Sequence, residues 1–144
     1  VILLIFQVKH YQIVKEIFLL YLLVIDLVYL SLIYLRLIPI SKIRNVRFIV
    51  CNPPYIPTEN YYLLDKETLH DPKISLDGGT KGLDFYIRII DFLENLQYSG
   101  DIYFEIDPLI IEELDKFLLE KALKIVYKKQ DYLKLDRLLK ITFP

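Results

Sequence analysis

Along this chain, segments whose apolar residues recur with the period of a helix alternate with short apolar segments. This alternation limits the possible folds more than any other sequence feature. Residues 82–97 place apolar side chains on one helical face, and residues 101–107 alternate like a strand. A second helix is expected at 108–121, with Pro108 at its start. This alternation predicts an α/β fold, with a mostly parallel sheet and helices on both faces.

The neighbouring segments extend the pattern on both sides. Residues 43–51 are rich in branched side chains and predict a strand, and the polar residues 58–81 predict a long loop. Residues 122–130 and 137–143 predict two closing strands. These two strands are too close in sequence for a parallel crossover, so we expect an antiparallel C-terminal strand pair.

The helix at 82–97 has a predicted buried face and a predicted end. Ser99-Gly100 is expected to end it. The residues expected on the buried face are Leu83, Tyr86, Ile87, Ile90, Leu93 and Leu96.

An apolar run at residues 17–35 carries a single charge, Asp26, and is long enough to span a bilayer. Fully buried parallel strands also read as unbroken Leu, Ile and Val runs, so a buried strand followed by a helix is the alternative. The α/β pattern of the rest of the chain favours the buried segment, and a membrane location is not expected.

Composition excludes several classes of protein. The 144 residues allow one domain, and 18 basic against 19 acidic side chains argue against direct nucleic-acid binding by phosphate neutralisation. Cys51 is the single cysteine, which excludes an internal disulfide framework and makes a reducing compartment, the cytoplasm, the default location. His10 and His70 are too far apart, with too few acids nearby, to predict a metal site.

The motif Asn52-Pro53-Pro54-Tyr55 directly follows a predicted strand, at the sheet edge where open α/β folds bind ligands. Two consecutive prolines fix two φ angles and remove two N–H donors, so this backbone is stiff and presents only carbonyl oxygens. The Asn52 side-chain oxygen and the Pro53 carbonyl could accept both hydrogens of one planar NH2 group, while Tyr55 supplies an aromatic wall. Such a clamp could align a poorly nucleophilic nitrogen with a methyl donor.

A structural role for the same four residues is also open. Asn52 could cap the end of the strand while the prolines only stop the sheet ladder.

Five segments, in order, resemble those of the release factor glutamine N5-methyltransferases, the HemK/PrmC family. They are CNPPYIP at 51–57, Asp71-Pro72, SLDGGTKGLDFY at 75–86, Glu105 in YFEI, and DYLKLDR at 131–137. The resemblance implies a Rossmann-like class I methyltransferase fold that uses S-adenosylmethionine. It also implies methyl transfer to the side-chain amide of the glutamine in the Gly-Gly-Gln loop of peptide-chain release factors.

The same resemblance assigns the site residues. Asn52, Pro53, Pro54 and Tyr55 would be the catalytic and substrate-binding residues, and Asn52 would also contact the cofactor. Asp26 resembles the acidic residue at the end of the second strand that binds the cofactor ribose.

All four glycines lie downstream of Asn52, so no glycine-rich cofactor loop precedes it. We therefore expect a single, N-terminally incomplete methyltransferase domain, whose activity is open. Residues 1–40 would be a divergent cofactor-side segment and residues 43–144 the substrate-side segment. Residues 1–6 could be a remnant of the first strand or the start of a helix.

Two other functions compete with this interpretation. An N6-adenine DNA methyltransferase shares the clamp, but the neutral charge and the segment at 75–86 disfavour it. The other is a non-catalytic protein in which residues 17–35 cross a membrane.

Several charged residues are expected to have structural roles. Asp131 and Arg137 should pair and fix the final turn, and Asp77 and Asp84 should cap a loop and a helix.

Overall fold

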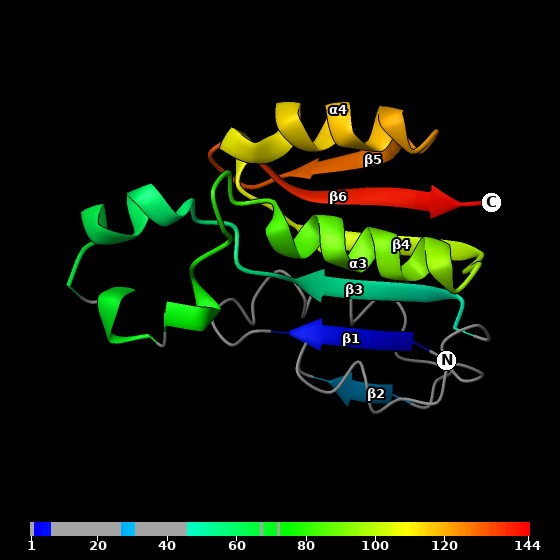
Figure 1. Cartoon of the computed structure of the whole chain (residues 1–144), viewed down its shortest axis with the longest axis horizontal. Coiled ribbons are helices and arrows are strands. Elements are labelled where there is room, and N and C mark those ends of the chain that lie inside the picture. The colour runs from blue at the N-terminus through cyan, green and yellow to red at the C-terminus, as the bar shows by residue number, and fades with distance from the viewer. Residues whose placement is uncertain (1, 7–26, 31–45, 67, 72) are drawn as a thin grey trace.

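The computed structural model describes residues 2–6, 27–30, 46–66, 68–71 and 73–144 of the chain. Its described strands form one six-stranded sheet in the order β2-β1-β3-β4-β6-β5 (Figure 1). The strands are β1 (Ile2–Phe6), β2 (Leu27–Leu30), β3 (Phe48–Asn52), β4 (Gly100–Glu105), β5 (Ile125–Gln130) and β6 (Asp136–Phe143).

Strand directions confirm the predicted α/β sheet. Strands β2, β1, β3 and β4 are parallel to one another, whereas β6 runs antiparallel to both β4 and β5. The segment at residues 1–6, for which strand and helix were both open, contains strand β1, which lies between β2 and β3.

The strand order creates a topological switch point between β1 and β3. From β1 the chain continues to β2 on one side, and from β3 it continues to β4 on the other side. Open α/β sheets bind ligands in the crevice outside the carboxyl ends of the two strands at such a point. The fold therefore marks the carboxyl end of β3 as a ligand-binding position.

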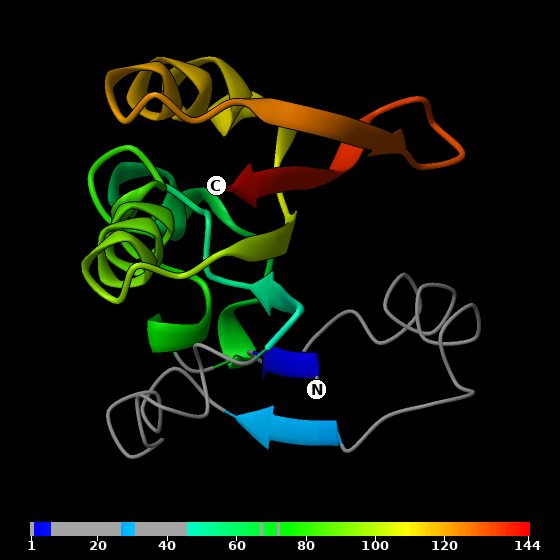
Figure 2. The ribbon, with the colours of Figure 1, turned by 90° about the vertical axis from the view of Figure 1, so that its right-hand side faces the viewer.

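Two amphipathic helices, α3 (Asp84–Asn95) and α4 (Ile111–Glu120), lie on the same side of the sheet (Figure 2). A 3-10 turn, η5 (Pro108–Ile110), precedes α4, so Pro108 stands near the helix start as predicted. The central core residues between the helices and the sheet are Ile49, Cys51, Tyr86, Ile90, Leu93, Ile102, Phe104, Leu114, Leu118, Leu139 and Ile141. We predicted helices on both faces of the sheet, and the described helices confirm this for one face. The connections through 7–26 and 31–45 lie outside the described residues.

Helix α3 differs in two details from its prediction. Ile87 was expected on the buried face, but it is only partly buried at the margin of the core. Ile89 is buried in the core instead. The helix ends through Gln97, which has φ 53° and donates its N–H to Glu94, rather than through Ser99-Gly100. Gly100 instead begins β4.

The long polar loop predicted at 58–81 contains three short 3-10 helices. These are η2 (Thr58–Leu63), η3 (Thr68–His70) and η4 (Lys73–Ser75). They project beyond the ends to which the arrows of β1 and β3 point (Figure 1). The longest loop that the structure describes therefore adjoins the switch point.

Most of the apolar run at 17–35 lies outside the described residues. The part that is described, Leu27–Leu30, is strand β2, paired in parallel with β1. This finding favours the buried-strand interpretation. Across the described parts of the chain, no helix has the length and apolar character needed to cross a membrane.

Candidate active site

The corner formed by Asn52, Pro53, Pro54 and Tyr55 lies directly at the switch point. Asn52 is the last residue of β3 and stands opposite Phe6, the last residue of β1. The Asn52 side chain is 8% exposed, and both prolines are buried, while Tyr55 is half-buried. Burial raises the pKa of Tyr55 to about 12, so its hydroxyl stays protonated at neutral pH. The four predicted site residues are thus consecutive on one rigid corner.

A second segment, Leu76 to Gly79, holds this corner in place through backbone hydrogen bonds, and we call it the support segment. The Ile56 N–H donates to the Leu76 carbonyl at 3.1 Å, and the Gly78 N–H donates to the Ile56 carbonyl at 2.7 Å. The Thr58 N–H donates to the Gly79 carbonyl at 2.9 Å. These bonds continue the bridge between Ile56 and Asp77, so the segment lies beside the corner like a short parallel strand.

Glycine is required where this segment touches the corner. A β-carbon on Gly78 would lie 2.7 Å from the Pro54 carbonyl oxygen and 2.9 Å from the Tyr55 α-carbon. Gly82 has φ 73° and lies against the Tyr55 carbonyl oxygen. The glycines after the corner therefore act as its support, which explains why Gly-Gly-Thr-Lys-Gly accompanies Asn-Pro-Pro-Tyr in this chain.

The two acids beside these glycines differ from each other in role. Asp77 Oδ1 accepts hydrogen bonds from the Gly79 N–H at 3.0 Å and from the Thr58 hydroxyl at 2.7 Å, so it caps the loop as predicted. The hydrogen bond from Thr58 makes the largest contribution to lowering the pKa of Asp77. The helix-capping prediction for Asp84 is wrong: Leu83 is the N-cap of α3, and the Asp84 carboxylate packs against Gly79 in the first turn.

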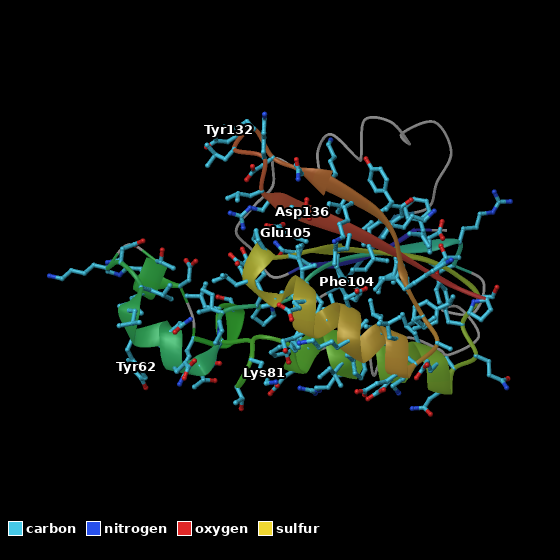
Figure 3. The ribbon with its side chains drawn as sticks, turned by 90° about the horizontal axis from the view of Figure 1, so that it is seen from above. Tyr62, Lys81, Phe104, Glu105, Tyr132 and Asp136 are labelled. Carbon is cyan, nitrogen blue, oxygen red and sulfur yellow. The ribbon has the colours of Figure 1, made fainter. Side chains whose placement is uncertain are left out.

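Glu105 is a buried acid at this sheet edge, which the sequence pattern did not single out beyond its place in the YFEI segment. It is the last residue of β4, and its side chain is 6% exposed. The preceding residue, Phe104, belongs to the core (Figure 3 labels both residues). Burial raises the Glu105 pKa to about 7, against a smaller lowering effect of the Arg137 charge. The alternation in β4 places Glu105 on the face opposite the core residue Phe104, so the sequence pattern gave no signal that Glu105 is buried.

Arg137, in β6, forms hydrogen bonds with two carboxylates near the carboxyl end of β4. Its Nε donates to Asp131 Oδ2 at 3.1 Å, and its Nη1 donates to Asp107 Oδ2 at 3.3 Å. Asp131 also accepts the N–H groups of Leu133 and Leu135 at 2.8 and 3.0 Å. The predicted pair of Asp131 and Arg137 is confirmed, and it links the final turn to the carboxyl end of β4.

Two other sequence predictions concern the cofactor and metal ions. Asp26, the predicted ribose-binding acid, lies outside the described residues, and the nearest described strand begins at Leu27. Among the residues with a described placement, no group of three or more His, Cys, Asp or Glu side chains could hold a metal ion.

Comparison with known proteins agrees with the resemblance in the motifs. The chain is 34% identical over 91 residues to the release factor glutamine methyltransferase of Chlamydia trachomatis, covering 62% of this chain and 31% of the relative. It is 32% identical over 101 residues to that of Clostridium acetobutylicum, covering 69% and 35%. With that of Bacillus cereus it shares 48% identity over 62 residues, covering 40% and 21%. This chain resembles part of the release factor glutamine methyltransferases.

The chain spans about a third of the length of these release factor glutamine methyltransferases. No protein-family model matches it. The similarity to these methyltransferases and the sheet together confirm the predicted class I methyltransferase fold, with its antiparallel C-terminal strand pair.

Proposed function

We propose that this chain binds the side-chain amide of a glutamine and serves its N5-methylation, with S-adenosylmethionine as methyl donor. The proposed substrate is the Gly-Gly-Gln loop of a peptide-chain release factor, in the cytoplasm. Relatives named release factor glutamine methyltransferase support the substrate class. The observation that carries the proposal is the position of Asn52: a buried amide at the switch point, opposite the end of β1.

The corner suits an amide nitrogen because it offers acceptors and few donors. Pro53 and Pro54 have no N–H, so the backbone after Asn52 presents only carbonyl oxygens. The Asn52 side-chain oxygen and the Pro53 carbonyl would each accept one hydrogen of the substrate NH2 group. Tyr55, half-buried with its hydroxyl protonated, would pack against the planar amide. The corner thereby fixes the nitrogen in one orientation before the methyl group arrives.

The same acceptors suit a cationic methyl donor. The backbone after Asn52 presents carbonyl oxygens, and the buried Glu105 ends the neighbouring strand β4, so a sulfonium group placed at this sheet edge would meet partial negative charge. When bound, S-adenosylmethionine supplies the activated methyl group. Asn52 would contact it from the substrate side, and the further assignment of Asp26 to the ribose stays a prediction.

Rigidity of the corner is part of its proposed action. Methyl transfer to a weak nucleophile depends on alignment, and small displacements of the acceptor nitrogen reduce the rate strongly. The hydrogen bonds from Gly78 and to Leu76 hold the chain just beyond Tyr55. The support segment would therefore act by positioning, without touching the substrate.

The decisive experiment compares Asn52→Ala with Asn95→Ala. Asn95 is exposed at the end of α3, so its replacement removes the same side chain away from the site. We expect Asn52→Ala to abolish methylation of a release factor and to weaken binding of a Gly-Gly-Gln peptide at least tenfold. Asn95→Ala should match the wild type in both measurements.

Two results would contradict the proposal. One is wild-type methylation and peptide binding by Asn52→Ala. The other is methylation of adenine in a DNA duplex in preference to the release factor, which would point to the N6-adenine chemistry instead.

A further inference from the structure

Asn52 and Glu105 are the two polar side chains that are buried among the residues the structure describes. They come from different strands and lie far apart in sequence. Parallel pairing of β3 with β4 brings Cys51 opposite Phe104, so the residues next along each strand, Asn52 and Glu105, are neighbours. Neighbouring strands lie about 4.8 Å apart. The two buried polar groups of this region are therefore adjacent.

Both side chains also lie on one face of the sheet. Cys51 and Phe104 belong to the core beneath α3 and α4, and side chains of successive strand residues point to opposite faces. Asn52 and Glu105 consequently face away from these helices. The Glu105 carboxyl thus shares its face and its strand end with the side-chain oxygen proposed to hold the substrate amide.

The Glu105 carboxyl is not explained by the packing around it. Its Oε2 is buried and has no hydrogen-bond partner in the described part of the molecule. The Tyr86 hydroxyl, from α3, donates to the Glu105 backbone carbonyl at 2.8 Å and not to this oxygen. A buried carboxyl oxygen without a partner is unfavourable for folding, which suggests that it serves a ligand.

The charges around Glu105 leave its protonation state adjustable. Arg137, from β6, is already committed to Asp107 and Asp131, so its effect on Glu105 is long-range and favours the carboxylate only weakly. Tyr55, from the corner, stays protonated because its pKa is about 12. Burial dominates, so the Glu105 pKa of about 7 allows the group to gain or lose a proton near neutral pH.

We propose that Glu105 is the proton acceptor for the substrate amide held at Asn52. This inference rests on the proposed function. In the reaction, the nitrogen forms a bond to the methyl carbon, the carbon–sulfur bond breaks, and sulfur keeps the electron pair. The methylated nitrogen then carries one hydrogen too many, and that proton passes to the Glu105 carboxylate. Asn52 can orient the hydrogen, but its neutral amide oxygen cannot keep the proton, whereas a carboxylate can.

Binding of the amide should already engage this group. An N–H hydrogen directed at Asn52 and shared with the neighbouring carboxylate stabilises the ionised form of Glu105. A Gly-Gly-Gln peptide that binds at pH 7 should therefore displace about half a proton, since about half of the Glu105 carboxyls are protonated beforehand.

The test measures this proton by calorimetry. Binding enthalpy of a Gly-Gly-Gln peptide to the chain is measured at pH 7 in two buffers with different heats of ionisation. The variant is Glu105→Gln, and the matched control is Glu120→Gln, exposed on α4. We expect proton release by the wild type and the control, and none by Glu105→Gln. In methylation assays, Glu105→Gln should lose at least a hundredfold in kcat and lose the rise in rate toward pH 7.

The outcomes separate the two proposals. If the wild type binds the peptide with no proton release, or Glu105→Gln releases the same fraction, the role of Glu105 is overturned while the amide site stands. If neither protein binds the peptide, the amide site itself is overturned, and the role of Glu105 with it. A thermal unfolding midpoint for Glu105→Gln at or above the wild-type value shows that any loss is not a failure to fold.

Discussion

The backbone N–H of Gly78 donates a 2.7 Å hydrogen bond to the carbonyl of Ile56, and this contact joins the support segment to the Asn-Pro-Pro-Tyr corner. Two motifs separated by a long loop thereby act as one structural unit. Proline cannot donate a hydrogen bond, so the corner depends on a neighbouring segment to hold the chain that leaves it.

Replacement of Gly78 by alanine should disturb the corner. The added methyl group would lie 2.7 Å from the Pro54 carbonyl oxygen, which is backbone and cannot move freely. We expect a loss of about 1–3 kcal/mol in the free energy of unfolding, measured in urea, and weaker peptide binding. Thr80→Ala, in the same loop but exposed, should change stability by less than about 0.5 kcal/mol. Equal effects of the two changes would contradict the close packing at Gly78.

Glu105 should make the stability of the protein depend on pH. Its folded-state pKa, about 7, lies above the ordinary value of 4.5, so the folded state holds the proton more tightly than the unfolded state. This contribution is fully present below pH 4.5 and is lost as pH rises through 7. The loss is of the order of 3 kcal/mol. Urea unfolding from pH 4 to 8 should show this decline, and Glu105→Gln should remove most of it; an unchanged profile in the variant would assign the decline to other groups.

Glycine in place of the residue that follows α3 or α4 in the left-handed conformation should stabilise the protein. Gln97 and Ala122 have φ 53° and 55°, and each follows the last turn of its helix. The left-handed conformation is unfavourable for residues with a β-carbon, so Gln97→Gly and Ala122→Gly should each stabilise by about 0.5–1 kcal/mol, measured as a higher unfolding midpoint. Lys124→Gly, exposed and outside these turns, serves as the control and should not stabilise.

The final turn should depend on Asp131 through two separate interactions. One carboxylate oxygen accepts two backbone N–H groups, and the other accepts Arg137 Nε. Asp131→Ala removes both and should destabilise by about 1–2 kcal/mol, whereas Asp131→Asn keeps an acceptor for the backbone and should lose less. Thermal unfolding of both variants, with Asp115→Ala on α4 as control, would measure this order. Equal losses in the two variants would show that the charge pair with Arg137, which both remove, matters more than the turn.

Local sequence pattern determined the elements of this protein well. The helix predicted at 82–97 is α3 (Asp84–Asn95), and the strand predicted at 101–107 is β4 (Gly100–Glu105). Both follow from the spacing of apolar residues, which is a local property. The short-range errors, at Gln97 and Asp84, arose where backbone conformation and packing replaced the expected glycine and cap.

Only the tertiary structure decided what lies beside the corner. Sequence by itself predicted Asn52, Pro53, Pro54 and Tyr55 as site residues, because the motif is contiguous and stiff. The position of β3 next to β1, the glycine support and the adjacency of Asn52 and Glu105 all depend on pairing between distant segments. Strand order and register are set by how the whole sheet buries its faces, and no local pattern of residues encodes them.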